Sequence, residues 1–182
     1  FQGEISGAAG FMEDASEETL MRAYQDSIDR FVAANITSGM DIGELKTSRF
    51  AELTSKIFLT MRYGVGEAKK TGKREYEVEV DIWPADVFVS FQDMLTEDSL
   101  KMAEKIEAGE YEGETEEETG QMILSDIINH AYELLDTAYM DIQYGDKETV
   151  TLRVYAERGG DASIDEDDMD RLFRQILRPD ES

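Results

Sequence analysis

The stretch that most restricts the fold is Glu75–Trp83, where acidic and apolar residues alternate one by one. The apolar positions are Tyr76, Val78, Val80 and Ile82, and the acidic positions are Glu75, Glu77, Glu79 and Asp81. Successive side chains of a β-strand point to opposite faces of the sheet. The pattern therefore predicts a strand with one buried and one hydrated face, which is typical of an antiparallel sheet covered on one side.

Further segments of alternating polarity extend this sheet. They are expected at residues 59–65, 149–155 and 162–164. Residues 69–73 are polar and include a glycine, which predicts a hairpin turn between the first two strands. Arg153 has the polar parity of its strand, so we expect it to face Glu77 and Glu79 if the two strands are neighbours.

Helical spacing of apolar residues fills most of the remaining chain. Helices are predicted at residues 16–34, 48–58, 84–95, 96–108, 121–140 and 169–176. Pro84 is expected in the first turn of its helix, and Thr96 is expected to cap a separate one. Residues 109–120 are acidic and punctuated by glycine, which predicts an exposed loop.

Helices and hairpin strands without regular strand–helix–strand alternation indicate an α+β domain, with several helices on one face of a small antiparallel sheet of three to four strands. We expect one such domain at residues 16–178. Residues 1–15 are interpreted as a tag remnant and a disordered leader, because Phe1–Gly3 resembles the end of a cleaved purification tag and the next residues lack periodicity. Residues 179–182 are expected to be a tail.

Charge and composition exclude several classes of protein. The 42 acidic residues outnumber the 18 basic ones, giving a net charge of -24 that would repel nucleic acid. No apolar run approaches the ~20 residues of a transmembrane helix. The absence of cysteine excludes disulfides, thiolate metal sites and cysteine nucleophiles.

The sequence contains no motif for an established catalytic centre. His130 is the only histidine, so neither a zinc site nor a Ser/His/Asp triad is supported by partner residues. It lies near the edge of an apolar helical stripe, and a structural role is favoured. We predict no catalytic residue, no metal and no cofactor, and the sequence leaves the ligand-binding residues unknown.

Two sets of residues could still bind a ligand. Residues 157–168 resemble an EF-hand loop only at Ile164, because Gly159, Ala162 and Asp168 stand where the motif needs a carboxylate, a glycine and a glutamate. We interpret Asp165–Asp168 instead as the start of a helix. Whether the acidic segment 110–118 binds a cation stays open. The aromatic residues that could line a pocket, although core packing is favoured for them, are Tyr63, Tyr76, Trp83 and Tyr155.

The hairpin YGVGEAKKTGKREYEVEVDIWP and the strand–turn–helix KETVTLRVYAERGGDASIDEDDMDRLFRQIL, in this order of elements, resemble uncharacterised secreted lipoproteins of Gram-positive bacteria with cystatin-like or NTF2-like α+β domains. The resemblance covers about residues 16–178. It implies export and a lipid anchor on an N-terminus that precedes this sequence, with an extracellular or cell-surface location. It supplies no catalytic residues.

These observations favour a non-enzymatic extracytoplasmic domain that binds a small ligand or another envelope protein, through the concave face of the sheet or the acidic loop. The alternative is an NTF2-like enzyme that uses a pocket carboxylate or His130. A third possibility is partner binding by an exposed apolar strip on the helix at residues 121–140.

Overall fold

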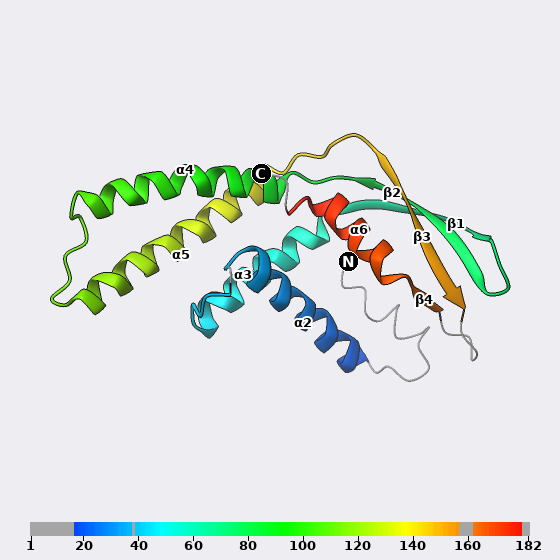
Figure 1. Cartoon of the computed structure of the whole chain (residues 1–182), viewed down its shortest axis with the longest axis horizontal. Helices are drawn as coiled ribbons and strands as arrows, with labels where there is room; N and C mark the ends of the chain where they lie inside the picture. The colour runs from blue at the N-terminus through cyan, green and yellow to red at the C-terminus, as the bar shows by residue number, and fades with distance from the viewer. Residues whose placement is uncertain (1–16, 38, 157–161, 180–182) are drawn as a thin grey trace. The chain divides into compact units, whose positions relative to one another are not determined.

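The computed structural model describes residues 17–37, 39–156 and 162–179 (Figure 1). The elements are α2 (Glu17–Asn35), α3 (Glu44–Leu59), β1 (Arg62–Lys70), β2 (Glu75–Trp83), α4 (Val87–Glu107), α5 (Glu116–Met140), β3 (Glu148–Ala156), β4 (Ala162–Ile164) and α6 (Glu166–Leu177). The predicted α+β class is confirmed. The predicted leader at residues 1–15 lies outside the described residues, as do residues 180–182 of the predicted tail.

The described chain divides into two compact units. The sheet, α2, α3 and α6 belong to the first, which holds the described residues up to Ala85 and those from Tyr144 to Pro179. The second is the helical hairpin of α4 and α5, within Asp86–Gln143. Each unit is described by itself below.

The sheet has four strands in the order β1-β2-β3-β4, and every neighbouring pair is antiparallel. The register places Val65 opposite Val80, and Val80 opposite Val150, so apolar side chains form rows across one face. The other face carries the acidic residues of β2 and the threonines of β3. The alternation at Glu75–Trp83 therefore predicted the sheet correctly.

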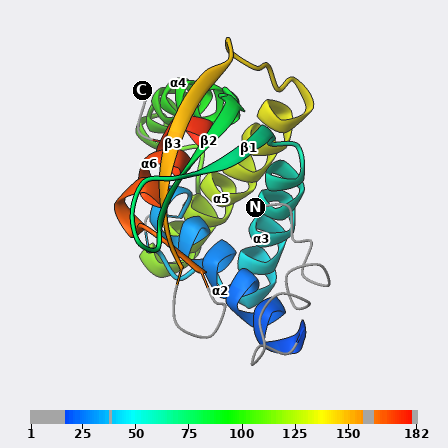
Figure 2. The same cartoon turned by 90° about the vertical axis from the view of Figure 1, so that its right-hand side faces the viewer.

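Helix α6 lies along the apolar face of the sheet, as Figures 1 and 2 both show. Phe173 of α6 meets Phe58 of α3 edge to face, with ring centroids 5.9 Å apart, and Phe58 meets Phe31 of α2 in the same way at 5.3 Å. These ring contacts join the three helices into one core. The buried residues of α2 and α3 around it include Ile28, Val32, Phe50, Leu53 and Ile57.

Two predicted helix boundaries are wrong for the same physical reason. Helix α3 begins at Glu44 and not near Ser48, and α4 runs unbroken through Thr96. The Ser48 hydroxyl donates to the Glu44 carbonyl and the Thr96 hydroxyl donates to the Gln92 carbonyl, each one turn earlier. A hydroxyl satisfied in this way sits inside a helix without ending it.

Pro84 also precedes its helix instead of entering it. Helix α4 begins at Val87 with Asp86 at the N-cap, and the Pro84 carbonyl accepts a hydrogen bond from Gly145 N at 2.8 Å. Ala85 forms an isolated antiparallel bridge with Tyr144. Pro84 therefore belongs to the end of the sheet unit.

The acidic segment at residues 109–120 is only partly a loop, because α5 begins at Glu116. The Thr115 side chain accepts from Glu118 N at 3.2 Å, and the Glu118 carboxylate accepts from Glu114 N at 2.8 Å. These two bonds satisfy backbone donors at the helix start, as in a capping box. Three glutamates in the first turn also favour the positive end of the helix dipole.

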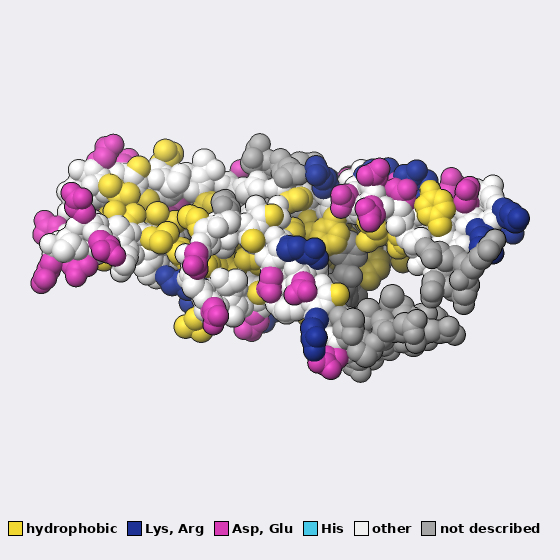
Figure 3. Space-filling model, turned by 60° about the horizontal axis from the view of Figure 1, so that its bottom comes forward, with side chains coloured by type: hydrophobic (Ala, Val, Ile, Leu, Met, Phe, Trp, Pro, Cys, Tyr) yellow, Lys and Arg dark blue, Asp and Glu magenta, His cyan; other side chains and the backbone are white. Residues whose placement is uncertain are grey.

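The helical hairpin holds a large share of the charge. Asp86–Gln143 contains 16 acidic residues and two lysines in the printed sequence, and Figure 3 shows acidic side chains gathered at its end (left). Its base is closed by hydrogen bonds between Asp86 N and the Gln143 carbonyl at 3.1 Å, and between Gln143 N and the Asp86 carboxylate at 2.7 Å. Among the described residues, no helix is both long and apolar enough to cross a membrane.

Thr54 on α3 provides a test of this packing. Its side chain is fully buried, and its hydroxyl oxygen has no hydrogen-bond partner among the described residues. We expect Thr54→Val to raise the free energy of unfolding by about 1 kcal/mol, because valine keeps the shape and removes a desolvated hydroxyl. Urea denaturation measures the change. Thr47→Val is the control: its hydroxyl donates to the Gly43 carbonyl, so we expect no gain in stability. A Thr54→Val variant less stable than the wild-type protein would show that the Thr54 hydroxyl is not an unsatisfied buried group.

Candidate ligand-binding cavity

An apolar cavity of about 380 Å³ lies between the sheet and α6. All four strands and the helix contribute aliphatic side chains, and one tyrosine joins them. The lining residues are Tyr63, Val65, Val78, Val80, Leu152, Val154, Ala162, Ile164, Met169, Leu172 and Ile176. No side chain in this lining carries a charge, so the cavity suits a hydrocarbon group and offers no ion pair to a ligand.

The exposure of the lining separates a closed floor from an open rim. Val80, Leu152 and Ile176 are at most 5% exposed, whereas Val65 is 66% exposed and Ile164 43%. Exposed aliphatic side chains beside a cavity form an apolar entrance. These two residues stand on the two edge strands, β1 and β4, so the cavity is reachable from solvent at the edges of the sheet.

A bulge in β1 shapes one wall. The register shifts between Val65 and Ala68, so one extra residue stands on β1 opposite β2. A Cβ atom on Gly66 would lie 2.9 Å from the Glu79 carbonyl oxygen, closer than packing allows. Glycine at this position lets the backbones of β1 and β2 approach while the strand bends.

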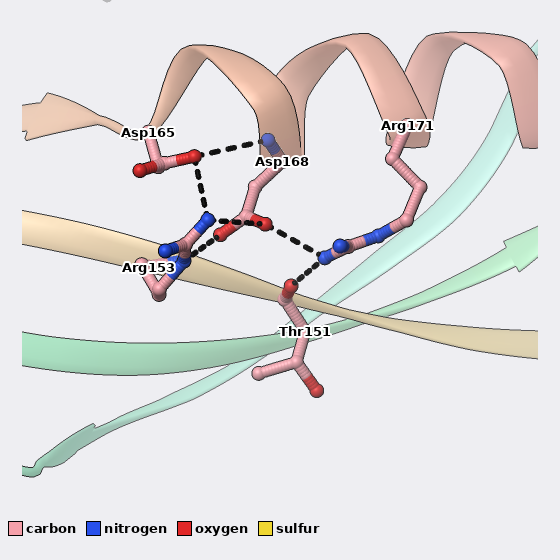
Figure 4. Close-up of polar contacts among 5 residues, drawn as sticks. All are labelled: Thr151, Arg153, Asp165, Asp168 and Arg171. Carbon is pink, nitrogen blue, oxygen red and sulfur yellow. Dashed lines mark hydrogen bonds and ion pairs between the residues drawn. The ribbon is translucent and has the colours of Figure 1, made fainter.

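The helix that roofs the cavity is held by a buried carboxylate, Asp168, in the first turn of α6 (Figure 4). Asp168 is 1% exposed. One oxygen accepts from the backbone N–H and the Nε of Arg153, both at 2.8 Å. The other oxygen accepts from Arg171 Nη2 at 2.9 Å and from Arg153 Nη2 at 3.2 Å. Both oxygens of the buried charge are thereby satisfied.

These contacts also cover the part of β3 that β4 does not reach. Arg171 Nη2 donates to the Thr151 carbonyl at 2.7 Å, and the Arg153 carbonyl accepts from Asp165 N at 3.0 Å. Together with the Arg153 N–H bonded to Asp168, three backbone groups of β3 are therefore bonded by α6 or its N-cap. These bonds fix the distance between the helix and the edge of β3 beside the cavity.

The expected partners of Arg153 were the glutamates of β2. The strands are neighbours and Glu77 stands opposite Arg153, but the guanidinium bonds to Asp168 and to Asp165, the latter at 2.7 Å. The Arg153 hydrogen bond, followed by the backbone contact and the charges of Arg153 and Arg171, lowers the pKa of Asp168 to about 2 despite burial. The hydrogen bond from Arg153 to Asp168 in turn raises the pKa of Arg153.

A sequence signal for Asp168 was present. Asp168, Leu172 and Ile176 are spaced at i, i+4 and i+8, and all three are buried. An acidic residue on the apolar stripe of a helix indicates a buried carboxylate that needs a cationic partner. The acidic residues Asp165–Asp168 also favour the positive end of the helix dipole, and this second role hides the buried carboxylate in the sequence pattern.

The EF-hand-like segment provides no metal site in the described part of the chain. Its residues 157–161 lie outside the described residues, and the Asp165 side chain caps α6. Among the residues that are described, no group of three or more His, Asp or Glu side chains is placed to hold a metal ion. This statement covers the described residues of the acidic segment 110–118 as well.

His130 lies on the helical hairpin and is half-buried. Its Nδ1 is 3.1 Å from Asp98 Oδ2, and its Nε2 is 3.7 Å from Asp126 Oδ1. The Tyr111 hydroxyl donates to the other Asp126 oxygen at 2.5 Å, and this bond is the main cause that raises the pKa of Tyr111 to about 12. The imidazole therefore joins α4 to α5, whereas the apolar cavity is lined by the sheet unit.

The four candidate aromatic residues have separate surroundings. Tyr63 lines the apolar cavity, and Tyr76 stands on the same face, opposite Val154. Trp83 and Tyr155 have the opposite parity along their strands, so they belong to the other face of the sheet.

A second hollow lies between α2 and α3 and measures about 760 Å³. Most of its lining residues are polar, and the charged ones are Asp29, Asp41, Glu44, Glu52 and Lys56.

Comparison with solved structures identifies one similar fold. The crystal structure of "a putative lipoprotein (ycdA)" from Bacillus subtilis subsp. subtilis str. 168 matches with a TM-score of 0.52 and 12% sequence identity. The match covers 90% of this chain and 48% of that chain, so this chain spans about half its length. No family model matches the chain, and no curated protein matches it.

At this identity the likeness concerns the fold alone. The predicted resemblance to lipoproteins is supported at that level, because the fold of this chain is similar to that of a protein described as a lipoprotein. Neither a cystatin-like nor an NTF2-like relationship follows from the match.

The anchoring carboxylate gives a stability prediction. We expect Asp168→Asn to lower the free energy of unfolding by about 3 kcal/mol, because the buried amide keeps one acceptor oxygen and turns its NH2 group toward guanidinium donors of Arg153 or Arg171. Thermal and urea unfolding measure the loss. Asp167→Asn changes a neighbouring exposed carboxylate and is expected to have little effect; equal effects of the two variants would show that Asp168 does not anchor the helix.

The lowered pKa of Asp168 predicts an acid-labile component of stability. Because the pKa is near 2 in the folded state and 3.8 ordinarily, the contribution is complete above about pH 4 and is lost as the pH falls toward 2. Urea denaturation at several pH values between 6 and 2 measures it. The wild-type protein should lose more stability over this window than Asp168→Asn, whereas parallel curves would refute the linkage.

Proposed function

We propose that this protein is a non-enzymatic extracytoplasmic binding domain, tethered to the cell surface by a lipid anchor, that holds the alkyl chain of a small ligand in the cavity between α6 and the sheet. The observation that carries the proposal is the uncharged, largely aliphatic lining of a 380 Å³ space that is open to solvent at the sheet edges. The similarity of the fold to a protein described as a lipoprotein supports the location.

The chemistry of the lining favours a hydrocarbon chain over a protein segment. A polypeptide that enters the cavity must bury amide groups, and such groups lose free energy unless they are hydrogen-bonded. The lining offers one hydroxyl, that of Tyr63, and otherwise hydrocarbon groups and the thioether of Met169. A saturated chain needs no such bonds, so it matches these walls better than the segment of another envelope protein.

The size of the cavity sets the length of the chain. An apolar cavity of about 150 Å³ is enough for benzene, so a volume of 380 Å³ corresponds to roughly ten to fifteen carbon atoms. Each buried methylene contributes about 0.8 kcal/mol before the cost of association. A ten-carbon ligand is therefore expected to bind in the micromolar range or more weakly.

The enzyme alternative receives no support from this cavity. None of its lining residues is a carboxylate or a histidine, and His130 lies in the other unit, bonded to Asp98. The binding alternative on the helix at residues 121–140 would need an apolar strip, but Ile128, Ala131, Leu135 and Ala138 are buried. Its exposed large apolar residues, Met122, Leu124 and Met140, stand at opposite ends of the helix and form no continuous strip.

Binding of 1-decanol, a neutral ten-carbon chain, tests the proposal. We expect it to raise the melting temperature and to shift the NMR signals of Val80 and Leu152. Val154→Phe fills the cavity and should abolish binding, whereas Thr151→Phe places the same ring on the hydrated face of β3 and should not. Circular dichroism checks that both variants fold, and Val78→Phe is a second filling variant. Binding that survives in both folded filling variants would refute the site.

A further inference from the structure

The turn between β1 and β2 concentrates positive charge in an acidic protein. Residues 69–75 contain four of the 18 cationic side chains and one carboxylate, whereas the whole chain carries 42 carboxylates. Figure 3 shows Lys and Arg side chains gathered at this end of the sheet unit (right). We call Lys70, Lys73 and Arg74 the tip cations.

The tip cations differ from most other cations of the protein in having no carboxylate partner among the described residues. Lys69, next to them, pairs with Glu79 at 2.8 Å. Among the described residues, the cations elsewhere that pair with a carboxylate include Arg22, Lys56, Lys101, Lys105, Lys147, Arg153, Arg171 and Arg178. All three tip cations are exposed, so they are available to an external anion.

The register connects one of the tip cations to the cavity. Lys70 stands opposite Tyr76, Tyr76 opposite Val154, and Val154 opposite Ile164. Residues that are directly opposite in an antiparallel sheet share one face. Val154 and Ile164 line the cavity, so Lys70 belongs to the same face and to the row of Ile164, a lining residue that is 43% exposed.

These positions divide the site into an apolar part and a cationic part. The cavity has no group that could neutralise a charge, so any charged headgroup must stay outside its rim. Screening in physiological salt limits the field of distant carboxylates to about 8 Å, so the nearest charges dominate at the tip. An anion is therefore attracted at this one end although the whole protein repels it.

We propose that the ligand is an anionic amphiphile whose alkyl chain lies in the cavity and whose carboxylate or phosphate headgroup is bound by Lys70, Lys73 and Arg74. This inference rests on the proposed function and adds the chemical class of the headgroup. A carboxylate and a phosphate ester present the same anionic oxygens to these cations, and the experiment separates the two sources.

Isothermal titration with four ten-carbon ligands, each below its micelle concentration, tests the headgroup. They are 1-decanol, decanoate, decyl phosphate and decyltrimethylammonium. We expect at least one anion to bind about tenfold more tightly than 1-decanol and the cation to bind less tightly. A preference for decanoate alone assigns a carboxylate, and a preference for decyl phosphate alone assigns a phosphate.

The variant Lys70→Gln/Lys73→Gln/Arg74→Gln should remove the preference and leave 1-decanol binding unchanged. Arg22→Gln/Arg30→Gln/Lys101→Gln removes the same charge from exposed helix positions and should keep the preference. Equal binding of all four ligands to the wild-type protein would overturn the headgroup assignment and leave the alkyl site intact. If no ligand binds, 1-decanol included, both the assignment and the proposed function fail. An anion preference that survives in the tip variant would also overturn the assignment.

Discussion

The carboxylate of Asp168 is the interaction on which the geometry of the sheet unit depends. It is a buried charge, and it is tolerated because two guanidinium groups and a backbone N–H satisfy its oxygens. The same bonds fix α6 to the uncovered edge of β3. A cavity under a helix persists only if contacts outside the cavity hold the helix in place. The bonds of Asp168 provide such contacts at the start of α6.

The cavity lining and the anchor of α6 therefore use different residues of the same helix. The polar residues at the start of α6 hold it to β3, while Met169, Leu172 and Ile176 face the cavity. The aromatic contact of Phe173 with Phe58 joins α6 to α3 from a position beside the cavity face, about 40° around the helix from Met169. The helix is thus held at its polar start and by a ring contact beside its cavity face, so the cavity face itself can remain incompletely packed.

Much of the fold could be predicted from the sequence, because alternation and helical spacing report which face of an element is buried. The strands β1 to β4 follow from such patterns, whereas the bonds of Arg153 to Asp165 and Asp168 do not, because alternation shows the face of a side chain and not its partner. The predicted helix boundaries are wrong at Ser48, Thr96 and Glu116–Gly120. A hydroxyl can bond to a carbonyl inside a helix without ending it, and a carboxylate can accept a backbone N–H where a helix begins. The cavity could not be predicted, since Val80 and Leu152 have the same pattern whether the helix above them packs closely or leaves space.

The bulge in β1 has a further consequence for how copies of this protein meet. Strand β1 is at the edge of the sheet, and all nine of its residues are exposed. A regular strand in this place would offer a straight row of backbone donors and acceptors to another chain. The irregularity between Val65 and Ala68 interrupts that row, and Lys69 and Lys70 place charge on its end. The edge is therefore a poor template for strand pairing, which keeps the apolar entrance beside it from promoting aggregation.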